Sequence, residues 1–480
     1  NYNTVVGDEA GTAITTGDYN TALGYQAGDA VTTGLSNTFI GGRAGTATTT
    51  ANYNTAVGER SFQTNTTGDN NVAMGWGSMT SNATGASNTA LGRSALAANT
   101  TASNNTAVGK EALTANTTGS ENAAVGTTAL KANTTGVSNS AFGREALFDN
   151  TTGGNNSAHG HQALANNTTA SNNTAVGSQS LKANTTGANN VAVGKSALDA
   201  NTTGDNNAAL GSDALGGLTT GSHNCAVGEQ TMYVATTVNN TTGLGTQALW
   251  SLTTGNENTA VGRISMLYTT TGYENAALGY YSLRTNTTGN KNTALGTFSM
   301  GNNTTGINNT ATGYNTLRSN TTASGSTAIG NSALYSNVTG EDNTAVGNIA
   351  LYSATGRDNT GCGRASGYEL TTGANNTLLG TNAGRSGSPS GSLTSQNYRV
   401  CISDNNVTNA YIKVAWTVTS DQRDKADITD FTHGLDYING LRPVNYVWDN
   451  RSNYADSVSD GSKKKTVPQL GFLAQEIEAV

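Results

Sequence analysis

A 17-residue repeat fills the first 380 positions of this chain and constrains its fold more than any other feature. A glycine closes the motif Asn54–Gly58, and the equivalent glycine recurs every seventeenth residue from Gly7 to Gly347. After one 16-residue step it recurs at Gly363 and Gly380, which gives 23 units. So strict a period means that each unit packs on a copy of itself, as in a solenoid.

Apolar residues keep fixed places within each unit. The residue before the reference glycine is apolar in 21 of the 23 units, and the exceptions are His159 and Thr312. Three and four residues after the glycine, Ala is followed by Leu or Met, as at Ala95 and Leu96. We therefore expect two short strands per unit, with both apolar columns facing a continuous core.

Polar residues recur as strictly as the apolar ones. Asn stands four residues before the reference glycine in 21 of the 23 units, with Thr241 and Ser326 as the departures. Stacked amides of this kind can hydrogen-bond along the axis and satisfy backbone groups in the turns. A second turn reads Asn-Thr-Thr-Gly, as at Asn65–Gly68, where Gly or Asn would tolerate a positive φ.

These patterns predict an all-β protein, a parallel β-solenoid of 23 coils and on the order of 110 Å in length. A helix is excluded because no segment keeps apolar residues at a 3.6 spacing, and disorder because low-complexity chains do not hold apolar residues in fixed places. Each coil has only about two large apolar side chains, and the other strand face has small residues such as Ala. So thin a core predicts a parallel homotrimer, in which another chain approaches the small residues closely.

Composition excludes several function classes. With a net charge of −7 and 11% charged residues, the chain lacks the basic clusters that nucleic acid or an anionic membrane requires. No apolar run approaches the roughly 18 residues of a membrane span. Cys225, Cys362 and Cys401 are too scattered for a disulfide framework. We expect no metal at His159 and His161, which need not converge, and no cofactor.

The threonine pair of the second turn suggests one alternative, because parallel rows of threonine on a rigid rod could bind ice or another crystal. Adjacent side chains in a turn diverge, so ice binding is disfavoured. Exposed residues just after the reference glycine vary from coil to coil, as at Trp76, Arg93 and Tyr280-Tyr281. They could form a binding surface on a regular frame, or simply be solvated.

Two families resemble this chain. The unit Asn54–Gly58 resembles the head repeats of trimeric autotransporter adhesins and the longer-period repeats of phage tail fibres, over residues 1 to about 384. Ser420–Ile428, Leu441–Trp448 and Gly471–Ile477 resemble, in order, blocks of the intramolecular chaperone domain of endosialidase tail spikes, the S74 peptidase family. That domain continues through long helices, so we expect a truncated α+β start here and a fragment of a longer protein at both ends.

The second resemblance implies a chaperone that templates a trimer and then cuts itself off. Carried over by position, Ser420 would be the nucleophile and Lys425 its general base, with Asp421 and Arg423 shaping the site. The sequence runs on past Ser420 to Val480, so the cut either never happens in this protein or has not been made in this chain.

Three segments are therefore expected: a shaft over 1–384, a linker and β neck over 385–419, and the chaperone start over 420–480. The predicted function is a structural and adhesive trimeric fibre of the phage tail-fibre type, outside the cell or on the virion, which binds a cell-surface glycan or protein receptor. The alternative is a bacterial extracellular adhesin or surface filament. An enzyme acting on polysaccharide would need a separate catalytic domain, which residues 1–419 do not supply.

Overall fold

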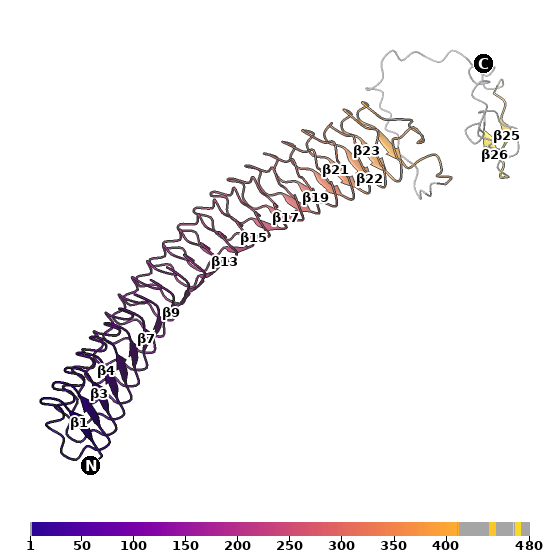
Figure 1. Ribbon diagram of the computed structural model, residues 1–480. Helices are drawn as coiled ribbons and strands as arrows, with labels where there is room; N and C mark the ends of the chain where they lie inside the picture. The colour runs from indigo at the N-terminus through magenta and orange to yellow at the C-terminus, as the bar shows by residue number, and fades with distance from the viewer. Residues whose placement is uncertain (1, 410, 412–440, 448–463, 465, 472–480) are drawn as a thin grey trace, which may run out of the picture. The chain divides into compact units, whose positions relative to one another are not determined.

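The computed structural model describes residues 2–409, 411, 441–447, 464 and 466–471. The chain divides into two compact units, Asn1–Thr408 and Asn409–Val480. The first unit is a gently curved solenoid whose strands stack in one row (Figure 1). The all-β, parallel β-solenoid predicted from the 17-residue repeat is confirmed.

Each coil contributes one three-residue strand to a single 24-stranded sheet. Neighbouring strands are parallel, and Thr21 of one coil pairs with Thr38 of the next. The strands are β1 (Thr4–Val6), β2 (Thr21–Leu23), β3 (Thr38–Ile40), β4 (Thr55–Val57), β5 (Val72–Met74), β6 (Thr89–Leu91), β7 (Thr106–Val108), β8 (Ala123–Val125), β9 (Ser140–Phe142), β10 (Ser157–His159), β11 (Thr174–Val176), β12 (Val191–Val193), β13 (Ala208–Leu210), β14 (Cys225–Val227), β15 (Thr242–Leu244), β16 (Thr259–Val261), β17 (Ala276–Leu278), β18 (Thr293–Leu295), β19 (Thr310–Thr312), β20 (Thr327–Ile329), β21 (Thr344–Val346), β22 (Thr360–Cys362), β23 (Thr377–Leu379) and β24 (Val400–Ile402).

The expectation of two strands per coil is wrong, because the second apolar column lies in a turn. Ala95 and Leu96 are fully buried, as expected, but Leu96 has a φ of 52°. Ser87 and Ser94 of the same coil have φ values of 58° and 54°, and such left-handed residues break up an extended strand. The position of Leu96 holds only Leu, Met, Phe or Gly in all 23 coils, so the β-branched residues that strands favour are missing from it.

The strand faces the opposite way from the prediction. Its central residue, such as Ala90, is buried, whereas Leu91, the residue before the reference glycine, is 44% exposed. The pattern Thr-Ala-Leu places an apolar residue on each face, so alternation alone permits either orientation. The core therefore consists of the central Ala of the strand packed against the Ala and Leu of the turn, and the larger apolar residue of each strand lies outside.

Volume is conserved where a coil departs from this pattern. Phe39 occupies the central strand position that is Ala in most coils, and Gly28 and Gly45 stand where Leu is usual. A β-carbon at Gly28 would lie 2.7 Å from Cδ2 of Phe39. Conversely, Gly361 replaces the central Ala, and a β-carbon there would lie 2.7 Å from Cγ of Leu351. Because the interior is closely packed, a larger residue at one position requires a smaller residue at the position it contacts.

The asparagine column forms the hydrogen-bonded ladder that the sequence predicts. Asn139 is buried, and both its backbone N–H and its Nδ2 donate to Oδ1 of Asn122, at 2.9 and 3.1 Å. Its Nδ2 also donates to the Gly153 carbonyl at 2.8 Å. In the Asn-Thr-Thr-Gly turn the positive φ expected at Gly is not found. Glycine is favoured there by close approach, since a β-carbon at Gly68 would overlap the Gly85 carbonyl, although Ala102 and Val238 occupy the same position in other coils.

Packing around Phe39 gives the first prediction. Gly45→Leu is expected to lower the free energy of unfolding by about 1–3 kcal/mol, because the new side chain overlaps the Phe39 ring. The backbone is no obstacle, since other coils hold Leu at this φ. Adding Gly28→Leu and Phe39→Ala restores the common pattern and should recover most of the loss. Denaturant unfolding followed by circular dichroism measures both effects, and a triple variant no more stable than the single one would contradict this account.

Candidate functional site

The four residues expected to perform self-cleavage, Ser420, Asp421, Arg423 and Lys425, lie outside the described residues. In the same C-terminal unit, β25 (Val444–Tyr446) pairs antiparallel with β26 (Gln469–Gly471). Val444 is opposite Gly471 in this pair. The two strands therefore join the second and third sequence blocks of the chaperone resemblance.

A second candidate surface lies along the turns of the solenoid. We call it the turn edge, and it consists of the residues one, two, five and six positions after each reference glycine. In the coils that follow residue 228, aromatic side chains gather on this edge. This aromatic ridge consists of Tyr233, Trp250, Tyr268, Tyr280, Tyr281, Phe298, Tyr314, Tyr335, Tyr352 and Tyr368.

Rings of the aromatic ridge contact one another from coil to coil. Tyr335 stacks on Tyr352 with ring centroids 5.0 Å apart and an angle of 3° between the planes. Tyr352 in turn stacks on Tyr368 at 5.3 Å. The spacing follows from the rise of about 4.8 Å between coils. Stacking leaves the ring edges and hydroxyl groups, and not the ring faces, for a partner.

Arginine side chains lie over the remaining ring faces. The guanidinium of Arg284 lies 4.8 Å from the ring centroid of Tyr281, and that of Arg318 lies 4.5 Å from that of Phe298. Each cation–π contact of this kind is worth about 0.5–1 kcal/mol at an exposed site. The ridge thus presents phenol hydroxyls beside oriented guanidinium groups, which can bind hydroxyl and carboxylate groups of a ligand.

Beyond β23 the coil lengthens before it pairs with β24. Thr377 is opposite Val400, a spacing of 23 residues in place of 17, and the extra residues form turns. The segment expected as a linker thus runs inside the same compact unit, where Leu393 is buried. The β neck expected within 385–419 includes β24, and residues 410 and 412–419 of that segment lie outside the described residues.

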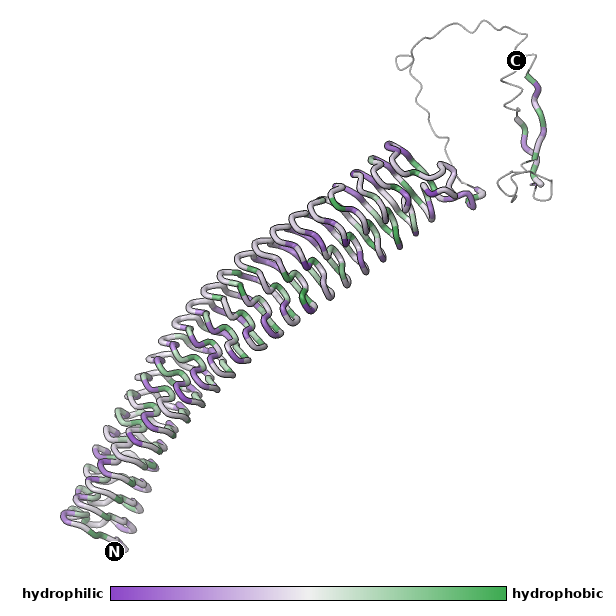
Figure 2. The backbone as a smooth tube through the Cα atoms, turned by 45° about the horizontal axis from the view of Figure 1, so that its top comes forward, coloured by the Kyte–Doolittle hydropathy of each residue, from purple (hydrophilic) through white to green (hydrophobic). Residues whose placement is uncertain are grey.

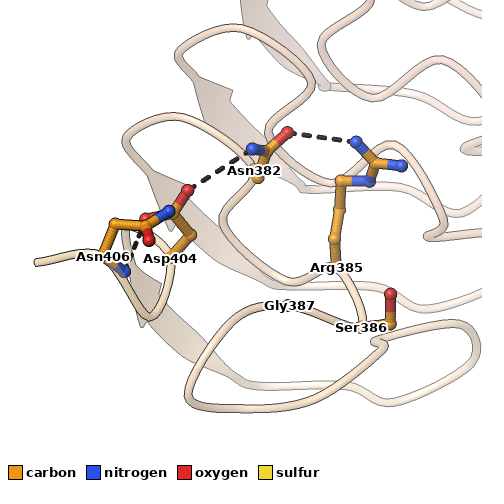
Figure 3. Close-up of a pocket in the computed structure, with 6 residues that line it drawn as sticks. All are labelled: Asn382, Arg385, Ser386, Gly387, Asp404 and Asn406. Atoms are coloured by element: carbon orange, nitrogen blue, oxygen red, sulfur yellow. Dashed lines mark hydrogen bonds between the residues drawn. The ribbon is translucent and has the colours of Figure 1, made fainter. Parts of the chain in front are cut away.

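A shallow hollow of about 270 Å³ lies at this lengthened coil (Figure 3). Arg385 donates from Nη1 to Oδ1 of Asn382 at 3.0 Å, and Asn382 donates to Asp404 at 3.4 Å. The backbone N–H of Asn406 holds the pKa of Asp404 below its usual value. These polar groups hydrogen-bond to one another across the hollow. The hollow therefore shows no arrangement for catalysis.

Glu369 fastens the inserted turns to the preceding coil. Its carboxylate accepts hydrogen bonds from the Ser392 hydroxyl at 2.5 Å and the Ser386 backbone N–H at 3.2 Å. Arg385 lies 3.5 Å from the same carboxylate. The Ser392 hydroxyl, followed by the Ser386 amide and Arg385, lowers the pKa of Glu369.

His159 and His161 have different neighbours. His159 projects from the outward side of β10 against the Phe142 ring, whereas Nε2 of His161 lies 3.0 Å from Nη2 of Arg144. Among the described residues no three His, Cys, Asp or Glu side chains are arranged to hold a metal ion. That part of the chain likewise contains no helix long and apolar enough to cross a membrane.

The threonine pair presents one exposed row. The first Thr of each pair is turned toward the next coil, as where Oγ1 of Thr100 donates to the Thr117 carbonyl at 3.0 Å. The second, such as Thr101, is exposed. An ice-like plane would need two exposed rows, so the geometry does not favour this alternative.

Comparison with known proteins adds one match. Residues 420–480 match the S74 peptidase family, described as the chaperone of endosialidase. This chain therefore fits a tail-fibre or endosialidase-type protein. No curated protein and no solved structure matches the chain. In a tail-fibre or endosialidase-type protein the combination of solenoid and chaperone segment indicates a fibre with an intramolecular chaperone.

The pKa of Glu369 gives a pH-dependent prediction for this chain. Because the pKa of Glu369 is lowered in the folded state, its carboxylate stabilises the inserted turns at any pH above the usual pKa of glutamate. That contribution is lost as the pH falls through the lowered value. Hydrogen exchange at the Ser386 amide, measured relative to its intrinsic rate at each pH, should therefore rise several-fold on acidification. In Glu369→Gln it should be fast already at neutral pH, and Glu341→Gln, an exposed position elsewhere, serves as the control. Equal exchange in the parent and in Glu369→Gln would contradict the assignment.

Proposed function

We propose that this chain is the shaft and chaperone segment of a homotrimeric fibre that attaches its bearer to a host-cell surface. The observation that carries the proposal is the chaperone-of-endosialidase match at residues 420–480, immediately after a 24-stranded solenoid. We infer a shaft over 1–384, a neck over 385–419 and the start of the chaperone from 420. Such a fibre works outside the cell, on a virion tail or a bacterial surface.

A long solenoid has a specific need for a chaperone. Every coil is nearly identical to the next, so two chains can pair one coil out of register at little cost in contacts. A domain at one end that brings three chains together fixes their common start before the shafts pack. This reasoning supports assembly, and not catalysis on an external substrate, as the role of residues 420–480.

Self-cleavage is the part of this proposal that rests on Ser420. A serine hydroxyl becomes a nucleophile when a neighbouring base takes its proton, and Lys425 is the base that the resemblance assigns. Attack of the Ser420 hydroxyl on the carbonyl of residue 419 would break the C–N bond, form an ester that still joins the two parts, and free the α-amine of Ser420, which takes up the proton that Lys425 removed from the hydroxyl. Water would then hydrolyse the ester and sever the chain. Asp421 and Arg423 would position the two reacting groups.

Mass spectrometry of the full-length protein under denaturing conditions tests this cleavage. The parent should give two fragments that meet at Ser420, whereas Ser420→Ala should give one intact chain because it lacks the nucleophile. Lys425→Ala should also remain intact, and Lys413→Ala, outside the motif, should be cleaved like the parent. A single intact mass from the parent would contradict self-cleavage, and the chaperone segment would then stay attached to the fibre.

We propose the aromatic ridge as the surface that binds a host-cell glycan. Its hydroxyl and guanidinium groups can bind sugar hydroxyls and acidic sugars, and the rigid frame repeats them over many coils. The paired change Tyr335→Ser and Tyr352→Ser should weaken binding to a panel of immobilised bacterial surface polysaccharides about tenfold, as expected for central aromatic contacts. The matched control is Tyr19→Ser and Tyr53→Ser, two exposed tyrosines away from the ridge. Undiminished binding by the first pair would remove the ridge as the attachment surface.

The alternative is a bacterial surface filament or adhesin with the same solenoid and chaperone. The two differ in the segment that precedes these repeats in the gene. A domain that docks on a virion would favour the tail fibre, and a secretion signal would favour the bacterial filament.

A further inference from the structure

One face of the sheet pairs a column of threonines and other small residues with a column of apolar residues along the solenoid. We call it the outer face, and it consists of the first and third residues of β1 to β23. The third residues project away from the core, and Leu210 and Leu278 are 49% and 50% exposed. Apolar segments recur from coil to coil along the tube (Figure 2). The large hydrophobic members of this column that are more than one-third exposed are Val6, Leu23, Met74, Leu91, Phe142, Val176, Leu210, Leu278, Leu295, Ile329 and Leu379.

Charge is absent from the outer face. In all 23 strands from β1 to β23, neither outward position holds Asp, Glu, Lys or Arg. The first position is Thr, Ser, Val, Ala or Cys, and the third is apolar except at His159 and Thr312. The turn edge, only two residues further on, carries charges such as Arg93, Lys110 and Lys195. A solvated surface would tolerate charge at both places, so the outer face is under a constraint that solvent does not impose.

The outer face covers a large area when its threonine column is counted with the apolar one. At about 4.8 Å per coil and about 3.3 Å per residue, 23 coils and three residues give roughly 110 Å by 10 Å, or about 1,100 Å². A stable protein interface buries about 800 Å² on each partner. The outer face alone is therefore large enough for a stable interface.

Three observations identify the occupant as further copies of this chain. Only a partner with the same rise per coil stays in phase over so long a face, and a second copy has that rise. Threonine and small residues beside the apolar column allow close approach of another sheet. A chaperone segment at the C-terminal end of every chain, as the match at 420–480 indicates, would bring copies together parallel, with their ends side by side.

We propose that the outer faces of three copies, parallel and in register, pack on one another along the fibre axis. This inference rests on the proposed homotrimer and specifies the surface that forms it. It also reverses the sequence-based expectation, in which small residues faced the partner, because the small residue of each strand faces the core and the large one faces the neighbouring chain.

Two native cysteines report on this packing. Cys362 is the third residue of β22 and is exposed in the single chain, and Cys225 is the first residue of β14. Both belong to the outer face. Cys401 is the central residue of β24 and is buried in its own coil, so it provides an internal reference that assembly does not change.

Thiol labelling of the assembled full-length protein is the deciding experiment. Cys362 should react with a maleimide at least about tenfold more slowly than an exposed thiol in the same coil, because the interface must open first. The reference thiol is Arg364→Cys in a Cys362→Ser chain, two residues away on the turn edge. A trimeric parent in which Cys362 reacts as fast as the reference thiol overturns this packing and leaves the trimer to the C-terminal segment.

A pair of lysine substitutions tests whether the outer face holds the trimer together. Leu210→Lys with Leu278→Lys places uncompensated charges in the interface and should reduce the mass measured by light scattering from three chains to one. Thr127→Lys with Ser178→Lys, both on the turn edge, should remain trimeric. Circular dichroism checks that both variants keep their sheet, and if the first pair does not fold, the labelling ratio decides alone.

Light scattering of the unsubstituted protein separates the two proposals. A mass of one chain, 48.7 kDa, would overturn the homotrimer and this packing together. A mass of three chains that survives the Leu210→Lys and Leu278→Lys pair, with fast labelling of Cys362, would overturn only the packing.

Discussion

Hydrogen bonding between successive coils is the constraint on which the rest of this structure depends. The backbone N–H of Thr21 donates to the Asn37 carbonyl and that of Gly24 to the Val6 carbonyl, both at 2.8 Å, so each coil is fixed to both neighbours. At this spacing any residue inside a coil touches its own counterpart. Asparagine amides can repeat there because each both donates and accepts, and glycine can because it has no side chain to collide. The strict sequence period is the result.

The sequence predicted the architecture because the period is a property of the whole chain, but it could not assign the two faces of the strand. Thr-Ala-Leu is apolar at its second and third residues, and the second faces the core only because Leu96 and its equivalents already fill the interior. Those leucines sit at positive φ, which no apolar pattern reveals. Their restriction to Leu, Met, Phe or Gly was the available signal, and it distinguishes this turn from a strand.

The surface features also differ in how far the sequence alone could predict them. The aromatic ridge combines residues one, two, five and six positions after the reference glycine. Only the tight turn brings those positions together in space. In the sequence, therefore, only the adjacent pair Tyr280 and Tyr281 indicated this ridge. The residues expected to cut the chain are assigned by the resemblance of three sequence blocks, and this assignment depends on no solenoid geometry. Inward and outward positions therefore record different requirements: the interior fixes residue size, the outer face excludes charge, and the turn edge is free to diversify.

Compensation around Phe39 bears on how such a chain can change its length. An ordinary coil touches only its two neighbours, so the gain or loss of seventeen codons lengthens or shortens the rod by about 4.8 Å and joins surfaces that already fit. Phe39 breaks this freedom, because its ring occupies space that Gly28 and Gly45 leave in the turns on either side of it. Those coils must be inherited as a block, whereas the uniform stretch from Leu96 to Leu215 is where copy number can drift between related genes.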